Sequence, residues 1–285
     1  MEETEVIPQV IPVRHPGRWL TSAVIVVLAA MVINSLLTNE RFEWDVVGEY
    51  FLSSQILAGL ARTIQLTVIG MTLGISIGVI VAVMRLSPNP ILSGFSRFFI
   101  WLFLGVPLLV QLLFWFNVSA LYPTVSLGIP FGPEFVSGSA NLFITTFTAA
   151  ILGLALHEAA YMAEIVRSGI LSVDSGQTQA SAALGMTRGQ MMRRIILPQA
   201  IRVIIPPTGG RTINLVKMSS LVSVLSLPEL LYSTQIIYAR TYQTIPLLIV
   251  ACLWYLIVVT VLTVGQHYLE RHYQRKGFDV LRPAV

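Results

Sequence analysis

The sequence predicts an all-α membrane protein with about six transmembrane helices. Of its 285 residues, 55% are hydrophobic and only 11% are charged, whereas charged residues make up about a quarter of an ordinary soluble domain. The mean hydropathy is +0.76. So little charge cannot cover the surface of a soluble domain, which nearly excludes a soluble enzyme. The high apolar content and a net charge of only +4 exclude a disordered chain.

Five uncharged stretches are long enough to cross a bilayer, which takes about 20 mostly apolar residues. These stretches are 19–39, 63–84, 98–133, 135–156 and 241–269. The third is expected to end where Pro, Gly and Ser become frequent, and the fourth to continue as a helix to about Ile170. A sixth stretch, 195–227, is apolar but carries Arg202, Arg211 and Lys217, which makes it the least certain span.

The positions of Lys and Arg predict that both chain ends, 1–18 and 272–285, are cytoplasmic tails. With that orientation, only three basic residues outside the spans fall on the outer side, Arg41, Arg62 and Arg240. The N-terminus starts with acidic residues and its apolar stretch is long, so it does not resemble a signal peptide. We therefore expect 19–39 to be a retained helix in a multi-pass protein.

The cytoplasmic connection after Ile170 has helical signals of its own. Residues 172–175 offer several N-cap candidates, and Gly185 is the expected C-cap. Thr187 and Gln190 then fit a capping box that begins the next helix. This pattern predicts a short helix outside the membrane. By itself it also fits an interfacial helix that only anchors the loop.

The spacing in this connection resembles the EAA loop of the membrane-spanning subunits of ABC importers. In that loop EAA is followed by three residues, Gly, nine residues and Ile-x-Leu-Pro. Here residues 179–181 (Gln-Ala-Ser) stand at the EAA position, Gly185 follows, and 195–198 (Ile-Ile-Leu-Pro) close the motif. Residues 160–170, 107–111 (PLLVQ) and 217–221 (KMSSL) are similar to segments of polar amino-acid importers. The resemblance covers about 59–271.

The chain also departs from the family pattern at three places. Residues 104–107 read Leu-Gly-Val-Pro where the family usually has Arg-Gly-Thr-Pro, and Gln179 replaces the first glutamate of EAA. Gly210 stands where an asparagine is common, with Arg211 beside it. These differences leave open which amino acid would be carried.

The resemblance implies a permease subunit of a polar amino-acid ABC importer of the type I fold in a bacterial inner or plasma membrane. It implies a transmembrane domain over 58–271, with a coupling loop at 171–195 and helix 19–39 as an addition to a five-helix core. The implied partners are ABC ATPase subunits, an extracytoplasmic substrate-binding protein, a second permease chain (identical or different) and the lipid bilayer, but no nucleic acid. The residues expected to couple to the ATPase are Gly176, Gln179, Ala180, Ser181, Leu184 and Gly185.

The sequence has no GxxxxGK[ST] phosphate loop, so ATP would be bound by a partner, and we expect neither a cofactor nor an enzymatic activity in this chain. A lone Cys252 and four scattered histidines give no metal-site spacing.

Polar residues inside the spans are the candidates for substrate binding. Glu158 lies in an apolar helix, and its partner would be a cationic ligand group or Arg211 or Lys217. Gln111 would face a cavity or join two helices, and Pro107 should kink its helix and free a carbonyl. We also expect the Pro206-Pro207 and Gly209-Gly210 pairs to break their helix, because interrupted helices often form transporter sites. The candidate substrate-binding residues are Glu158, Gln111, Arg211, Asn214 and Ser219.

Two rival functions stay open at this point. One is an ion-coupled secondary transporter of small polar solutes, with Glu158 as the relay. The other is a membrane scaffold or an intramembrane enzyme, although no catalytic set of Ser, His and Asp is evident. The structured loop distinguishes the importer from both rivals.

Overall fold

The computed structural model describes residues 16–129 and 132–278, and the chain divides into two compact units, 1–44 and 45–285. In the first unit, α1 (Pro16–Thr38) precedes a short 3-10 helix, η1 (Glu40–Phe42). The indole Nε1 of Trp44 donates a hydrogen bond to the carbonyl of Leu36 at 2.8 Å, which ties the segment after η1 to the end of α1.

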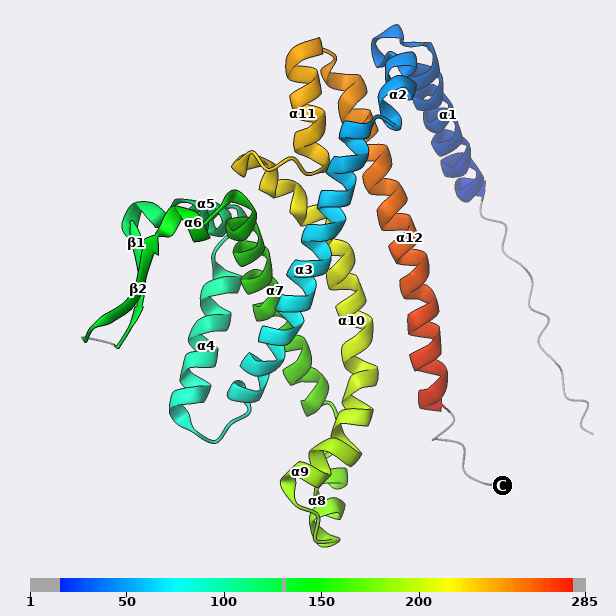
Figure 1. Ribbon diagram of the computed structural model, residues 1–285. Helices are drawn as coiled ribbons and strands as arrows, with labels where there is room; N and C mark the ends of the chain where they lie inside the picture. The colour runs from blue at the N-terminus through cyan, green and yellow to red at the C-terminus, as the bar shows by residue number, and fades with distance from the viewer. Residues whose placement is uncertain (1–15, 130–131, 279–285) are drawn as a thin grey trace, which may run out of the picture. The chain divides into compact units, whose positions relative to one another are not determined.

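The second unit is a helical bundle with one small hairpin (Figure 1). Its elements are α2 (Trp44–Phe51), α3 (Ser54–Arg85), α4 (Pro90–Gly105), α5 (Leu108–Leu121), β1 (Thr124–Gly128), β2 (Glu134–Ser139), α6 (Ala140–Phe143), α7 (Thr146–Leu171), α8 (Ser175–Ala183), α9 (Arg188–Met191), the π-helix η2 (Met192–Ile196), α10 (Leu197–Met218), the 3-10 helix η3 (Ser219–Leu225), α11 (Leu230–Thr241) and α12 (Thr244–Phe278).

Four of the described helices, α1, α3, α7 and α12, are long and apolar enough to cross a membrane. Two bent pairs raise the number to six: α4 with α5, bent by 106°, and the stretch from α9 to η3 with α11, bent by 45°. The predicted all-α fold with about six transmembrane helices is confirmed. The antiparallel β1–β2 hairpin, in which Thr124 pairs with Ser139, was not predicted from the sequence.

The core of the second unit is the contact between α3 and α7. Gly70, Gly74 and Gly78 lie one turn apart on α3 and face α7. A Cβ at position 74 would lie 2.8 Å from the Cβ of Glu158, and one at position 78 would lie 2.9 Å from the carbonyl oxygen of Ala159. Small residues at this spacing let two membrane helices approach closely. The glycines of α3 therefore fix the place where Glu158 is buried.

The prolines inside α10 do not break the helix, so the expected break at the proline and glycine pairs is wrong. Gln266 of α12 donates from Nε2 to the carbonyl of Pro206 at 2.9 Å. A Cβ at position 209 would lie 2.8 Å from Cδ of Gln266, so Gly209 leaves room for this side chain. The neighbouring helix thus supports the backbone at the prolines. The break comes later, after η3, where Ser226 takes a left-handed conformation with φ 59°.

Candidate functional site

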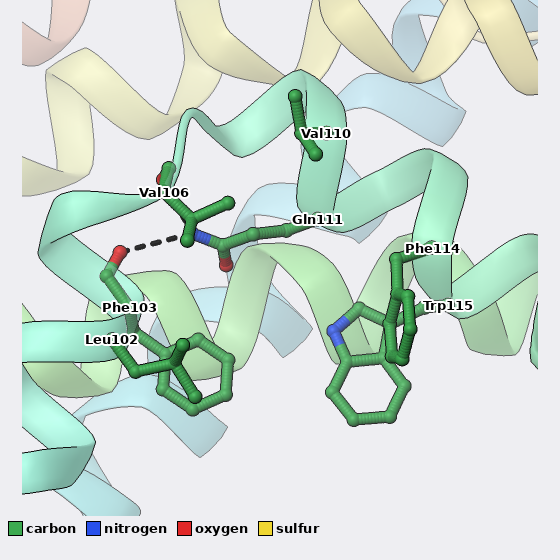
Figure 2. Close-up of a pocket in the computed structure, with 7 residues that line it drawn as sticks. All are labelled: Leu102, Phe103, Val106, Val110, Gln111, Phe114 and Trp115. Carbon is green, nitrogen blue, oxygen red and sulfur yellow. Dashed lines mark hydrogen bonds between the residues drawn. The ribbon is translucent and has the colours of Figure 1, made fainter.

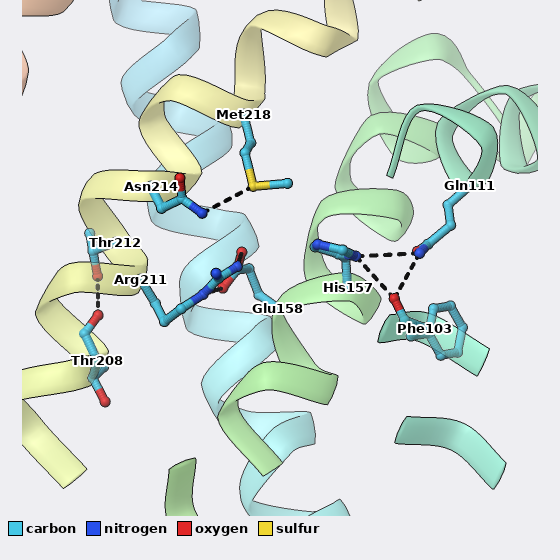
Figure 3. A network of polar contacts seen from close by, with 9 residues as sticks. All are labelled: Phe103, Gln111, His157, Glu158, Thr208, Arg211, Thr212, Asn214 and Met218. Carbon is cyan, nitrogen blue, oxygen red and sulfur yellow. Dashed lines mark hydrogen bonds and ion pairs between the residues drawn. The ribbon is translucent and has the colours of Figure 1, made fainter. Parts of the chain in front are cut away.

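A charged cluster joins α7 to α10 (Figure 3). Glu158 lies near the middle of α7, and its side chain has no exposed surface. Arg211 of α10 donates from Nε to Oε2 of Glu158 at 3.0 Å and from Nη2 to Oε1. The guanidinium carbon of Arg211 also lies 3.6 Å from the centre of the Tyr161 ring. Glu158 therefore pairs with Arg211 and not with Lys217, whose side chain is exposed.

This ion pair uses the strongest geometry available to the two groups. A planar guanidinium meets both oxygens of a carboxylate in a fork, and its flat face stacks on an aromatic ring. Removing one partner of such a buried pair leaves an uncompensated charge, which is far more costly than losing the attraction alone. Opening this pair without a replacement charge would therefore be costly.

His157, the residue before Glu158, points in another direction from α7, toward the break between α4 and α5. Pro107 has no N–H, so the carbonyl of Phe103 loses its helical partner. Gln111 compensates by donating from Nε2 to this carbonyl at 2.9 Å and to the carbonyl of Val106 at 2.8 Å. The Nδ1 atom of His157 lies 3.1 Å from the same Phe103 oxygen. The kink expected at Pro107 is present, and a side chain satisfies the freed carbonyl.

The network also assigns the tautomer of His157. Both amide hydrogens of Gln111 are used on the two backbone carbonyls, so none remains for the Nδ1 atom of His157, 3.3 Å away. His157 then carries its hydrogen on Nδ1 and donates it to the Phe103 carbonyl, leaving Nε2 as an acceptor. His157 and Gln111 together hold α4, α5 and α7 to one another.

Gln111 also faces an apolar pocket of about 320 Å³ in the angle between α4 and α5 (Figure 2). Leu102, Phe114 and Trp115 are among the side chains that line it. The Oε1 atom of Gln111 is buried and has no hydrogen-bond partner within the described part of the chain. Both roles considered for Gln111, joining helices and facing a cavity, are therefore compatible with its position.

The two remaining candidate substrate-binding residues are Asn214, farther along α10, and Ser219, directly after its end. Asn214 is one turn beyond Arg211, and its Nδ2 contacts the sulfur of Met218 at 3.4 Å. Ser219 is buried and donates to the carbonyl of Val216 at 2.7 Å. The described contacts thus bring Glu158 and Arg211 together and do not link Asn214 or Ser219 to that pair.

The second group of candidate residues lies on α8, which follows α7 and precedes α9 and α10 (Figure 1). Oδ1 of Asp174 accepts a hydrogen bond from the amide of Gly176 at 2.7 Å and caps the start of α8. Thr187 and Gln190 form the expected capping box at the start of α9. The short helix predicted from the sequence is therefore present, with a firm boundary at each side.

The turn after α8 requires glycine. Gly185 has φ +72°, in the left-handed region, and its amide donates to the carbonyl of Ala182 at 2.9 Å. The amide of Met186 donates to the carbonyl of Ser181 at 3.1 Å. These two bonds form a Schellman motif, the usual way to end a helix with glycine. A residue with a side chain would strain this turn.

The surface of α8 is mostly accessible. Gln179 and Ala180 are exposed, and Leu184 keeps 81% of its surface exposed. Ser181 is buried and donates to the carbonyl of Gln177 at 2.6 Å. An exposed leucine at the tip of a well-capped helix is a feature that a partner protein could cover.

Residues 74–275 match the family model described as the binding-protein-dependent transport system inner membrane component. The chain belongs to this family. The permease is 45% identical over 266 residues to the arginine transport system permease protein ArgU of Corynebacterium glutamicum, covering 93% of this chain and 82% of that protein. It is 34% identical over 243 residues to the probable amino-acid ABC transporter permease protein YckA of Bacillus subtilis, covering 85% and 98%.

A solved structure agrees with these relatives. The crystal structure of an amino acid ABC transporter with histidines superposes on the permease with a TM-score of 0.65 at 33% identity, covering 76% of this chain and 94% of that chain. The expected family and type I importer fold are therefore confirmed. The permease is a multi-pass membrane subunit of an ABC importer that works with an ATPase and a binding protein, and it has no ATPase activity of its own.

Sequence reasoning missed a second buried carboxylate of the permease, Glu229. It caps α11, accepting hydrogen bonds from the amides of Leu231 at 3.0 Å and Tyr232 at 2.7 Å, and it also accepts from the hydroxyl of Tyr255 at 3.0 Å. Its side chain is fully buried, and no ion pair to it is found among the described residues. The sequence did mark Glu229 as a candidate, because it is the only acidic residue in the sequence between Asp174 and Glu270.

Proposed function

We propose that the permease carries polar amino acids inward through the membrane, and that arginine is the first substrate to test. The observation that carries the proposal is the ion pair of the fully buried Glu158 with the mostly buried Arg211, which joins two membrane helices. An amino acid has a carboxylate that suits Arg211, and a cationic one has a second positive group that suits Glu158. The name of the relative ArgU supports arginine as the choice.

In this proposal, each candidate residue has a distinct role. Glu158 binds the cationic group of the substrate, and Arg211 binds the carboxylate. Asn214 offers an amide one turn away, and Gln111 keeps a free acceptor at the edge of its pocket. Ser219 bonds to its own helix and stabilises the end of α10, next to the substrate path.

We also propose that α8 is the coupling helix that contacts the ATPase, with Gly176, Gln179, Ala180, Leu184 and Gly185 at or near the contact. Its capped ends keep it rigid, and its apolar tip is exposed. Because α8 lies between α7 and α10 in the chain, a push from the ATPase would reach the two helices that carry Glu158 and Arg211. Such rigid-body motion could open the path alternately to each side. Ser181 is buried and stabilises α8 through its hydrogen bond to the carbonyl of Gln177.

The assembly and topology in this proposal follow the sequence predictions. Two permease chains, identical or different, form the path, and both chain ends are cytoplasmic. The transmembrane domain spans 58–271, its coupling loop is 171–195, and helix 19–39 is an addition to the five-helix core. The excess of basic residues in the predicted cytoplasmic segments supports this orientation.

Uptake of radiolabelled arginine into proteoliposomes tests the proposal, with the ATPase and binding protein of the same importer present. Removing the charge with E158Q should lower ATP-dependent uptake about tenfold or more, because a charge-assisted hydrogen bond is worth about 1.5–3 kcal/mol. Glu164 is the matched control, since it pairs with Arg167 on the same helix but both side chains are about one-third exposed. E164Q should change uptake little, because exposed pairs contribute at most about 1 kcal/mol.

Two results would contradict the proposal. Uptake that needs an ion gradient and no ATP would favour the rival secondary transporter. Equal uptake by E158Q and the unmodified permease would show that Glu158 has only a structural role.

A further inference from the structure

The contacts of Arg211 are those that a free guanidinium ion would seek. Its Nε and Nη2 atoms bond to the two oxygens of Glu158, and its planar group lies 3.6 Å over the ring of Tyr161. A carboxylate fork and an aromatic face together are the two strongest recognition elements for guanidinium. Glu158 and Tyr161 thus form a box whose chemistry matches a cationic group of either kind, guanidinium or ammonium.

The carboxylate of this box is fixed more firmly than the group that it binds. Glu158 has no exposed side-chain surface, and its Cβ atom lies against Gly74 of α3. Arg211 keeps 16% of its side chain exposed and reaches the box from another helix, α10, on a long flexible side chain. Glu158 and Tyr161 both lie on α7, whereas Arg211 extends from α10. Figure 3 shows Arg211 reaching Glu158.

We infer that Glu158 and Tyr161 are a binding site for the guanidinium or ammonium group of the substrate, and that Arg211 fills this site as a built-in plug until the substrate displaces it. The inference rests on the proposed function, because it assumes that the permease carries cationic amino acids. Tyr161 then contacts the substrate, and Arg211 pairs first with Glu158 and afterwards with the substrate carboxylate.

The exchange keeps the charges of Glu158 and Arg211 paired. The side-chain cation of the entering amino acid takes the place of the Arg211 guanidinium on Glu158, and the released Arg211 then pairs with the substrate carboxylate. One ion pair becomes two. A cation without a carboxylate, such as agmatine, would displace Arg211 and leave it unpaired, which is unfavourable in a membrane interior. The plug therefore selects substrates that carry both charges.

Removing the plug should expose the site to a probe. The permease with its ATPase, in lipid nanodiscs, is titrated with agmatine and with methylguanidinium while its Tm is followed. R211A should show a saturable rise in Tm, because a ligand that binds only the folded state stabilises it. The unmodified permease should bind these probes at least about tenfold more weakly, since they must first displace Arg211. The double variant E158Q/R211A should show no rise.

A second variant covers the case in which R211A does not fold. R211Q keeps one amide donor toward Glu158, and it should show the same saturable rise with a weaker affinity. The ring of Tyr161 is tested by adding Y161L to the R211A or R211Q variant, which should weaken probe binding several-fold.

The outcomes separate this inference from the proposed function. Absence of a saturable shift in R211A and R211Q, or an equal shift in E158Q/R211A, would overturn the plug even if the permease transports arginine. Probe binding by R211A without arginine uptake by the unmodified permease would support the box and contradict the proposed function.

Discussion

Replacing Gly78 by alanine tests the close packing of α3 on α7, on which the position of Glu158 depends. A Cβ at position 78 would lie 2.9 Å from the carbonyl oxygen of Ala159 and 3.1 Å from the amide nitrogen of Ala163. Both are backbone atoms of α7, and they cannot rotate away as the end of a side chain can. The two helices would have to move apart.

The size of the effect follows from two opposing contributions. Overpacking of this kind costs about 1–3 kcal/mol, whereas alanine in place of glycine inside a helix gains about 1 kcal/mol. G78A should therefore lose up to about 2 kcal/mol in free energy of unfolding. Gly94 of α4 is the matched control, because a Cβ there meets nothing within 4 Å. G94A should keep the full gain, so the two variants should differ by about 1–3 kcal/mol.

Thermal unfolding of the purified permease in detergent, followed by tryptophan fluorescence, measures this difference. For a chain of this size, each kcal/mol shifts Tm by about 2–4 °C. G78A should melt below the unmodified permease, and G94A at or above it. If G78A melts as high as G94A, the helices are not in the contact that the structure shows, and the burial of Glu158 needs another explanation.

Four further changes test other parts of the structure. G185V should abolish coupled uptake but leave membrane insertion intact, because the left-handed turn after α8 requires glycine; G189A, where a Cβ has open space, should have normal uptake. Q111L should lower Tm, because the carbonyl of Val106 would lose its partner and an unsatisfied carbonyl costs about 1–3 kcal/mol; an unchanged Tm would contradict the network. E229Q should lower Tm by the equivalent of about 1 kcal/mol, since both carboxylate oxygens of Glu229 accept hydrogen bonds and an amide has only one acceptor oxygen. Deletion of residues 1–38 should leave uptake intact, and loss of assembly would show that the first helix is integral.

The local signals of the segment around α8 were sufficient to predict its structure. The Schellman turn at Gly185 and the capping box of Thr187 and Gln190 depend on residues within one or two turns of one another. A short polar helix can satisfy its ends with neighbouring residues or water. The sequence therefore contains nearly all the information about where this short helix begins and ends.

The membrane helices differ, because their ends and breaks depend on groups far away in sequence. The kink at Pro107 was predicted, but the sequence alone did not show that Gln111 and His157 would satisfy the freed carbonyl. The ion pair of Glu158 with Arg211 was one of several possible pairings, and only the packing of α7 against α10 selects it. Sequence reasoning thus found the polar residues and left their partners open.

The wrong expectation for α10 and the missed Glu229 have the same physical cause. In a bilayer, a backbone group without a partner costs several kcal/mol, so a helix breaks only where another segment supplies hydrogen bonds. Gln266 lies 60 residues after Pro206 in the chain, and its side-chain amide donates a hydrogen bond to the Pro206 carbonyl, where α10 continues. After η3 the carboxylate of Glu229 supplies acceptors for the first amides of α11, so the chain can stop and start again there. A search for helix breaks in this family should therefore look for buried carboxylates and amides that can form hydrogen bonds to free backbone groups. A proline alone does not predict a break.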